Sequence, residues 1–403
     1  MSYEPKADVL HKFDTTYQFA EGMNVYNFSP GPCLLPKKVL DVAASEMYNY
    51  HGTGQSVMEL SHRQDEFRFI NIMTKRELKK FLKVPDNFVI MLQQGGATLQ
   101  YTSLVKNLIK RKPHNKAMQI RSGMWSNQCL DELKRHCNAV VVADNITEND
   151  CCAMVPFNKW NIDPEASFFS FCSNETVNGW QWDMDYFPWH LIPKDCPVCV
   201  DMSSDIGTYP IPWDKVGVVY AGAQKNLGTA GCAIIIVRED LLGNRTADCP
   251  IMNDWKTFEI SPDKTYNTPC IWSLYVTGLN VSYMNQMGGL EYYMEKCRQR
   301  SLMLWDFIDR SGGYYRSKIT DKKFRSNVNV VFRIQDANEG LEDTFLSEAK
   351  KAGIVQIKAH YFCPGIRISM YNSMPVEGVS YLINFMREFM KRYPNTKYHA
   401  AKL

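Results

Sequence analysis

Lys225 stands out among the lysines of this sequence because of its neighbours. It lies in residues 220–231, YAGAQKNLGTAG, between an apolar run and two turn glycines, Gly228 and Gly231. No charged residue lies within six positions of it on either side. A lysine kept from water and from other charges has a lowered pKa, which suits it to form a Schiff base with a carbonyl compound. Alone, the segment is equally consistent with a lysine in a surface turn.

Asp201 strengthens the interpretation of Lys225. It ends the apolar run 198–201 and lies 24 residues before Lys225. Ligands of open α/β sheets bind beyond the carboxyl ends of the strands, where both residues would lie. A lone aspartate after a strand is more often a cap or turn residue. Beside a Schiff-base lysine, however, a buried carboxylate suits pyridoxal phosphate (PLP), because it keeps the pyridine nitrogen protonated. The pair therefore predicts a PLP enzyme.

Three weaker features could complete such a site. Residues 94–98, QGGAT, form a turn between a strand-like and a helix-like segment. Free N–H groups and the dipole at a helix start favour a phosphate there, and Thr98 adds a hydroxyl. Trp125 could stack on a flat ring, and Thr176 follows another strand-like run. Taken singly, each is more typical of an ordinary turn or core residue.

A scaffold for these residues follows from the alternation of short apolar runs with amphipathic stretches. Such an alternation is typical of a mostly parallel sheet covered by helices on both faces, so the predicted fold class is α/β. The expected strands lie at residues 88–92, 139–143, 168–172, 198–200, 216–221 and 232–237, with a helix at 98–110.

The chain changes character near residue 290, after two consecutive glycines. The elements expected beyond them are a helix at 290–310, strands at 327–334 and 366–370, and a helix at 376–392. This order indicates a smaller α+β unit. We therefore expect a large domain at 34–289, a small C-terminal domain at 290–403, and an N-terminal arm, 1–33, packed on the small domain.

Composition excludes several classes of protein. The 403 residues carry a net charge of +3 without a basic block, so a nucleic-acid or membrane-surface role has no support. No apolar stretch is long enough for a membrane span, and the N-terminus lacks the apolar core of a signal peptide. Thirteen scattered cysteines indicate reduced thiols in the cytoplasm. We interpret the Cys196–Cys199 CxxC as buried strand residues, and no metal site is expected.

Longer motifs around these residues resemble the phosphoserine aminotransferases, a family of class-V PLP enzymes. The matching stretches keep the family's order over nearly the whole chain: NFSPGPCLLP (27–36), HGTGQSVMELSHR (51–63), QGGATLQ (94–100), SNETVNG (173–179), VDMSSD (200–205), YAGAQKNLGTAG (220–231), VREDLLG (237–243), YNTP (266–269), GIRIS (365–369) and YNSMPVEGV (371–379). The resemblance implies a fold-type-I PLP transferase, with a seven-stranded sheet in the large domain.

The resemblance also implies a set of cofactor-binding residues. Lys225 would be the Schiff-base lysine and proton shuttle, Asp201 would meet the pyridinium nitrogen, and Trp125 would stack on the ring. Thr176 would bond to the cofactor, and Gln224 would lie near its phosphate. The full set is Ala97, Thr98, Trp125, Thr176, Asp201, Gln224 and Lys225, joined by Asn267 and Thr268, which would reach the cofactor phosphate of the partner subunit in a homodimer.

The implied reaction is a ping-pong transamination in serine biosynthesis. It would transfer an amino group between L-glutamate/2-oxoglutarate and 3-phosphohydroxypyruvate/O-phospho-L-serine. Arg367 would bind the substrate α-carboxylate with two parallel hydrogen bonds. From the residues alone, a guanidinium in the apolar run around Arg367 must meet either a ligand carboxylate or a structural acid. His62, Arg63 and His360 would face the distal anion of the substrate.

Two positions depart from the family pattern. Thr98 stands where many members have arginine, and Tyr361 follows His360 where the family usually has arginine. The second change removes a charge-assisted contact worth about 1.5–3 kcal/mol. Two rival functions stay open at this stage. One is cysteine desulfuration, for which Cys363 is the candidate thiol, and the other is a catalytically silent protein that keeps the fold.

Overall fold

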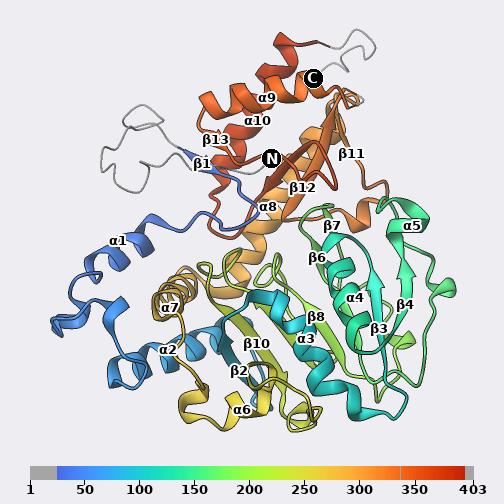
Figure 1. The fold of residues 1–403 in the computed structure, drawn as a ribbon. Helices are drawn as coiled ribbons and strands as arrows, with labels where there is room; N and C mark the ends of the chain where they lie inside the picture. Colours follow the sequence, from blue (N-terminus) through green and yellow to red (C-terminus); the bar gives the residue numbers. More distant parts are fainter. Residues whose placement is uncertain (1–24, 336, 395–403) are drawn as a thin grey trace, which may run out of the picture.

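A seven-stranded sheet forms the centre of the protein (Figure 1). The structure, a computed structural model, describes residues 25–335 and 337–394. The strand order is β2-β10-β9-β8-β5-β3-β4. The strands are β2 (Phe88–Gln93), β3 (Lys116–Arg121), β4 (Asn138–Asp144), β5 (Phe169–Cys172), β8 (Val198–Asp201), β9 (Val218–Gly222) and β10 (Ala233–Arg238). All neighbours are parallel except the pairs that involve β10. The predicted mostly parallel α/β sheet is confirmed.

The antiparallel direction of β10 has a local cause. Only residues 223–232 separate it from β9. A parallel neighbour would need a crossover of a dozen or more residues, so this short connection forces the chain to run back along the sheet. The connection contains Lys225, which therefore lies at the carboxyl end of β9.

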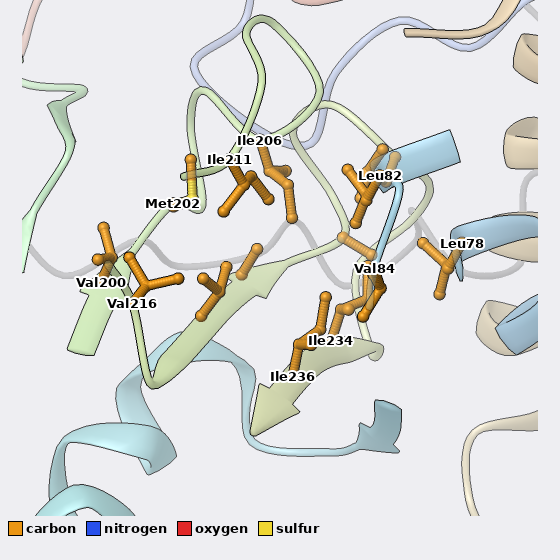
Figure 2. Packing of buried hydrophobic residues seen from close by; sticks show 14 of the residues in the cluster. Leu78, Leu82, Val84, Val200, Met202, Ile206, Ile211, Val216, Ile234 and Ile236 are labelled. Atoms are coloured by element: carbon orange, nitrogen blue, oxygen red, sulfur yellow. The ribbon is translucent and has the colours of Figure 1, made fainter. Parts of the chain in front are cut away.

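Alternate residues of β2, β8, β9 and β10 pack into two different cores, as expected for a sheet covered on both faces. In β10, Ile234 and Ile236 belong to one core and Ile235 to the other. Figure 2 shows the first core, in which Ile234 and Ile236 lie near Val84, with Leu78 and Leu82 of α2 (Asp65–Leu82) beyond. The helix α7 (Ile271–Gln286) packs beside α2 on this face.

The opposite face of the sheet carries two helices that begin at the same edge, where the parallel strands have their carboxyl ends. They are α3 (Gly96–Leu108) and α4 (Met124–His136). Tyr101 and Leu104 of α3 and Leu133 of α4 share a core with Ile235. Because both helices follow the carboxyl ends of parallel strands, their N-termini lie at one edge of the sheet.

A second unit begins with α8 (Gly289–Arg310). In Figure 1 this helix runs from the large sheet towards the C-terminal elements. Its antiparallel sheet has the order β11-β12-β14, and its core contains Phe332, Phe345 and Leu382. The predicted boundary near residue 290 stays a prediction. The elements are β11 (Tyr315–Ser317), β12 (Asn329–Ile334), β13 (Ile354–Val355), β14 (Ile366–Ser369), α9 (Glu339–Lys351) and α10 (Val376–Arg392).

The remaining elements are short. They are β1 (Tyr26–Asn27), α1 (Lys37–Ser45), α5 (Asn145–Asn149), β6 (Asn174–Glu175), β7 (Trp180–Gln181) and α6 (Trp255–Ile260). The strand β1 pairs in parallel with β13 of the second unit. Most of the predicted N-terminal arm, residues 1–24, lies outside the described residues.

All thirteen cysteines are free thiols. Cys196 and Cys199 are buried, and burial raises the pKa of Cys196 to about 12. Cys199 lies in β8, as predicted, but Cys196 lies in a bend before this strand, so the assignment to a strand is wrong for Cys196. In the described part of the chain, no helix is long and apolar enough to cross a membrane.

Candidate active site

A cavity of about 330 Å³ lies where the carboxyl ends of the central strands meet the second unit. Most of the residues singled out from the sequence line it. They are Ala97, Thr98, Trp125, Thr176, Asp201, Gln224, Lys225, His360 and Arg367. Residues separated by up to 270 positions thus share one cavity. The parallel strands end at one edge and bring the residues of the large sheet together there, and the second unit adds His360 and Arg367.

Lys225 is buried in this cavity, with 7% of its surface exposed. Its Nζ donates a hydrogen bond to Oγ1 of Thr176 over 2.7 Å and lies 5.2 Å from the centre of the Trp125 ring. Burial lowers the pKa of Lys225, and the nearby charge of Asp201 opposes the shift. Gly31, at φ +125°, packs against the Lys225 side chain, where a Cβ would lie 3.1 Å from Cγ. The amine is therefore desolvated, as the sequence predicted.

Asp201 is the last residue of β8 and is also buried. Its Oδ1 accepts hydrogen bonds from the backbone N–H and the hydroxyl of Ser203, at 2.9 and 2.6 Å. Its Oδ2 accepts a long bond of 3.4 Å from the hydroxyl of Tyr101. Burial raises the pKa of Asp201, and the bonds from Ser203 oppose that rise. One carboxylate oxygen is thus held in place, while the other can accept a stronger donor.

Trp125 is positioned by a carboxylate that the sequence analysis did not single out. Glu175 is fully buried and caps the start of α4. Its Oε2 accepts the backbone N–H of Trp125 at 2.9 Å, and its Oε1 accepts the backbone N–H of Ser126 at 3.0 Å. Burial raises the pKa of Glu175, and the hydrogen bonds from Ser126 and Trp125 oppose the rise. Glu175 therefore fixes the helix start from which the indole reaches the cavity.

Ala97 and Thr98 lie in the first turn of α3, after Gly95 and Gly96. Both glycines have positive φ, at 86° and 61°, which most other residues avoid. The backbone N–H groups of a first helical turn have no acceptor within the helix. This turn can therefore accept an anion, and the phosphate site indicated by the QGGAT motif stays a prediction.

Arg367 lies in β14 and has 6% of its surface exposed. Its Nη1 makes a long hydrogen bond of 3.5 Å to the carbonyl oxygen of Thr176, and its Nε has no partner among the described residues. Burial lowers the pKa of Arg367, and no carboxylate of the described chain pairs with it. Of the two possibilities left open by the sequence, this environment favours a ligand carboxylate over a structural acid.

His360 lines the same cavity, and burial followed by the charge of Arg367 lowers its pKa. Tyr361 beside it is 85% exposed. Cys363, the candidate thiol for desulfuration, is 2% exposed, and burial raises its pKa. A reactive cysteine needs exposure and a lowered pKa, and Cys363 has neither property.

Four predicted residues do not line this cavity and lie in a separate group. The Oγ1 of Thr268 and the Nδ1 of His62 are 2.9 Å apart. The amide of Asn267 donates to Gln94, whose own amide donates to the carbonyl oxygen of Thr268. The fourth residue, Arg63, is exposed one position after His62. Gln94 connects this group to the glycine turn of the cavity.

Sequence reasoning also missed polar residues that contact the predicted site residues. Tyr101 lies one turn after Ala97 on α3, and helical spacing could have indicated that the two share a face. Ser203 follows Asp201 by two positions, a common spacing for an aspartate that accepts local hydrogen bonds. For Glu175, no signal in the sequence distinguishes a buried helix cap from a surface residue.

Known proteins with similar sequences belong to one family. The sequence profile of class-V aminotransferases matches residues 25–382. A phosphoserine aminotransferase from Chromobacterium violaceum is 38% identical over 92% of this chain and 99% of its own length. The chain belongs to the phosphoserine aminotransferase family of class V. A second relative with that name, from Pseudomonas putida, is 39% identical over 91% of this chain and 98% of its own.

Solved structures of this aminotransferase family have the same fold. The phosphoserine aminotransferase of Bacillus circulans subsp. alkalophilus has a TM-score of 0.85 at 32% identity, over 92% of this chain and 99% of its own. The PLP-bound phosphoserine aminotransferase of Trichomonas vaginalis has a TM-score of 0.83 at 29% identity, over 90% of this chain and all of its own. The fold-type-I prediction is confirmed.

The cavity of this aminotransferase fits PLP, the cofactor of its family. A flat ring can lie against Trp125, with the first turn of α3 for its phosphate. The Oδ2 of Asp201, which accepts only the long bond from Tyr101, is available to its ring nitrogen. Lys225 would hold it covalently through Nζ. The side chains that contact the cofactor stay predictions at the level of single residues.

Proposed function

We propose that this protein transfers an amino group between L-glutamate/2-oxoglutarate and 3-phosphohydroxypyruvate/O-phospho-L-serine, a step of serine biosynthesis. The observation that carries this proposal is the presence of Lys225 and Arg367 in one cavity, both buried and neither paired with a carboxylate of the described chain. An amine that is desolvated and a guanidinium that lacks a counter-ion suit an amino-acid substrate. The high similarity to phosphoserine aminotransferases supports the choice of substrates.

Lys225 acts as the general acid and base of the proposed reaction. When bound, PLP supplies an electron sink and a temporary carrier of the amino group. The Nζ of Lys225 would take the proton from the substrate Cα and deliver it to the cofactor carbon that is bonded to the amino nitrogen. Thr176 orients that nitrogen by its 2.7 Å hydrogen bond. Asp201 would hold a proton on the ring nitrogen through its Oδ2, because its Oδ1 is already fixed by hydrogen bonds from Ser203.

Arg367 and His360 divide the recognition of the two substrates. Arg367 binds the α-carboxylate, which is common to glutamate and phosphoserine. His360, which lines the same cavity, meets the distal anion, which is a carboxylate in one substrate and a phosphate in the other. Tyr361, which follows His360, can offer a hydroxyl to this anion but not the guanidinium of an arginine.

The group of His62, Arg63, Asn267 and Thr268 completes the site of a second subunit in this proposal. These four residues lie together but outside the cavity of their own chain. A two-fold dimer brings the same patch of each chain to its partner, so each cavity would receive these side chains from the other subunit. We place this homodimer in the cytoplasm, on the basis of its many free thiols.

Cysteine desulfuration is not supported, because the thiol of Cys363 is buried and its pKa is raised. A silent binding protein is not supported either, because Lys225, Thr176 and Asp201 keep the arrangement that proton transfer requires.

Absorbance of the PLP-loaded protein tests the proposed function. Adding L-glutamate should lower the band near about 420 nm and raise one near about 330 nm, and 3-phosphohydroxypyruvate should restore the first. L-Alanine serves as a control donor without a distal anion and should act far more slowly. An unchanged spectrum with glutamate, or sulfide release from cysteine, would contradict the proposal.

A further inference from the structure

Tyr101 of α3 is a buried tyrosine at the active-site cavity that takes no part in the proton transfer by Lys225. It is 2% exposed and lines the cavity together with Asp201 and Lys225. Its hydroxyl donates a hydrogen bond to Oδ2 of Asp201 over 3.4 Å. This oxygen is the one available to the ring nitrogen of PLP. Tyr101 is therefore in contact with the carboxylate that controls protonation of the cofactor ring.

The ring of Tyr101 belongs to the apolar core on this face of the sheet. Leu104 and Val105 share that core, and Tyr220 packs edge-on against the ring with the centroids 6.3 Å apart. A hydroxyl in such a core is unfavourable unless it has a hydrogen-bond partner. Burial, followed by the charge of Asp201, raises the pKa of Tyr101, so the hydroxyl keeps its proton and stays a donor. The contact with Asp201 thus accounts for a tyrosine rather than a phenylalanine at this position.

Three hydrogen bonds hold the Asp201 carboxylate. Oδ1 accepts two of them from Ser203, and Oδ2 accepts the third from Tyr101. Each oxygen of an ionised carboxylate can accept about two hydrogen bonds, so Oδ2 keeps the capacity to accept one from a ring nitrogen. The direction of the carboxylate is therefore set at both of its oxygens by the protein itself.

Burial and hydrogen bonding have opposite effects on Asp201. Burial favours the neutral acid and raises the pKa of Asp201, whereas the bonds from Ser203 and Tyr101 oppose that rise. A proton between a carboxylate and a ring nitrogen resides on the more basic of the two. Each hydrogen bond to the carboxylate stabilises its ionised form and so favours protonation of the ring nitrogen. The protonated ring is the form that withdraws electrons from the reacting carbon.

We propose that Tyr101 is a positioning residue that keeps Asp201 ionised and turned towards the cofactor. Through Asp201, its hydroxyl directs the shared proton to the ring nitrogen of PLP. This role rests on the proposed function, because only a PLP enzyme requires that proton. Ala97 lies one turn earlier on the same helix, so α3 would serve both the phosphate and, through Tyr101, the ring nitrogen.

Other titratable groups also face Asp201 from the neighbouring elements. They are Cys129 of α4, Cys172 of β5, Asp205 after β8, Tyr220 of β9, and Lys225. Burial raises the pKa values of both thiols and of Tyr220, so these three groups are neutral at neutral pH. Burial raises the pKa of Asp205 to about 7. Its charge therefore has to be kept constant by comparing all variants at one pH.

¹⁵N NMR of the protein loaded with PLP labelled at the ring nitrogen tests the role of Tyr101. The ¹⁵N chemical shift distinguishes a protonated ring nitrogen from a neutral one. In Tyr101→Phe the signal should move from the wild-type position towards that of the neutral ring, because Asp201 becomes more basic. A wild-type signal already at the neutral position, or an unchanged signal in Tyr101→Phe, would overturn the proposal.

Tyr220→Phe is the matched control for this measurement. Tyr220 is equally buried and neighbours the Tyr101 ring, but no hydrogen bond joins it to Asp201 in the described chain. The variant should therefore keep the wild-type chemical shift. An equal movement in both variants would mean that loss of any buried hydroxyl nearby has this effect, and the specific role of Tyr101 would be wrong.

Stopped-flow kinetics of the reaction with glutamate provide a second readout. Tyr101→Phe should lower the rate constant by about 3- to 10-fold, as expected for one lost hydrogen bond, and leave the apparent Kd for glutamate unchanged. A higher Kd with an unchanged rate constant would place Tyr101 in substrate binding and contradict its role. The NMR signal needs bound PLP but no amino donor, so the two proposals fail separately. A wild type that does not react with glutamate contradicts the proposed function, whereas a Tyr101→Phe variant identical to a reactive wild type contradicts only the role of Tyr101.

Discussion

The Nζ of Lys225 donates a hydrogen bond to Oγ1 of Thr176 over 2.7 Å, although the two residues are 49 positions apart in the chain. Lys225 follows β9, and Thr176 follows the β5–β6 segment. The bond therefore joins two connections at the carboxyl edge of the sheet. It holds the amine within the cavity, and burial lowers the pKa of this lysine.

Lys225→Ala should abolish covalent attachment of PLP and lower kcat by at least roughly 100-fold, since both the anchor and the general base are lost. Borohydride reduction of the wild type, followed by peptide mass analysis, should find the cofactor on the Lys225 peptide. Lys75 is the internal control: burial lowers its pKa to about 7, but it lies outside the cavity. Labelling of Lys75 instead would contradict the assignment.

Arg367→Gln should raise KM for both glutamate and phosphoserine by about 10–150-fold, as one charge-assisted contact is worth about 1.5–3 kcal/mol. The free energy of unfolding should change little, because the variant removes a buried charge that has no counter-ion in the described chain. Steady-state kinetics with both substrates provide the measurement. A higher KM for only one of them would mean that Arg367 does not bind the shared α-carboxylate.

Tyr361→Arg should tighten O-phospho-L-serine binding by about 10-fold or more, because it adds a charged donor near the distal anion. The side chain is 85% exposed, so the longer arginine has room. Tyr361→Phe is the matched control and should bind almost as the wild type does. Spectral titration with phosphoserine measures both variants, and no gain with arginine would place Tyr361 away from the distal anion.

Hybrid dimers test whether His62 serves the cavity of the other subunit. A Lys225→Ala chain and a His62→Ala chain, each nearly inactive alone, should regain activity when they are unfolded and refolded together. In a shared site, each hybrid dimer has one cavity with both residues intact, so an equimolar mixture should reach about a quarter of wild-type activity. If His62 served its own chain, every cavity would lack one residue and the mixture would stay inactive.

Asp205 should make stability depend on pH. Burial raises its pKa to about 7, against the hydrogen bonds from Ser173, Tyr209 and Gln181. From about pH 4 to about pH 7 the folded protein keeps a proton that the unfolded chain releases. This group therefore lowers the free energy of unfolding as the pH rises through that range.

Asp205→Asn should remove this dependence, so urea denaturation at about pH 5 and pH 7.5 should show the variant gaining relative to wild type at the higher pH. Asp195→Asn is the control, since its carboxyl is exposed and the lysine at 112 lowers its pKa. A constant difference between Asp205→Asn and wild type would mean that Asp205 is ionised throughout this range.

Much of the scaffold was predictable because it depends on local patterns. The apolar run 88–92 became β2, and 232–237 became β10, within one residue at each end. Such runs are buried on both faces, so their composition alone identifies them. The direction of β10 and the order of the strands needed the tertiary structure, since several strand orders satisfy the same pattern.

The sequence by itself determined the chemistry of this protein. The uncharged surroundings of Lys225, the spacing from Asp201 and the family motifs identified a PLP-dependent aminotransferase, because these depend on residue types and their order. Only the tertiary structure decided which residues share a cavity. It separated His62 and Thr268 from Lys225. It also revealed the cap by Glu175 and showed that the Nε of Arg367 has no partner among the described residues. Burial and hydrogen bonding between distant segments arise from packing, and no short stretch of sequence encodes them.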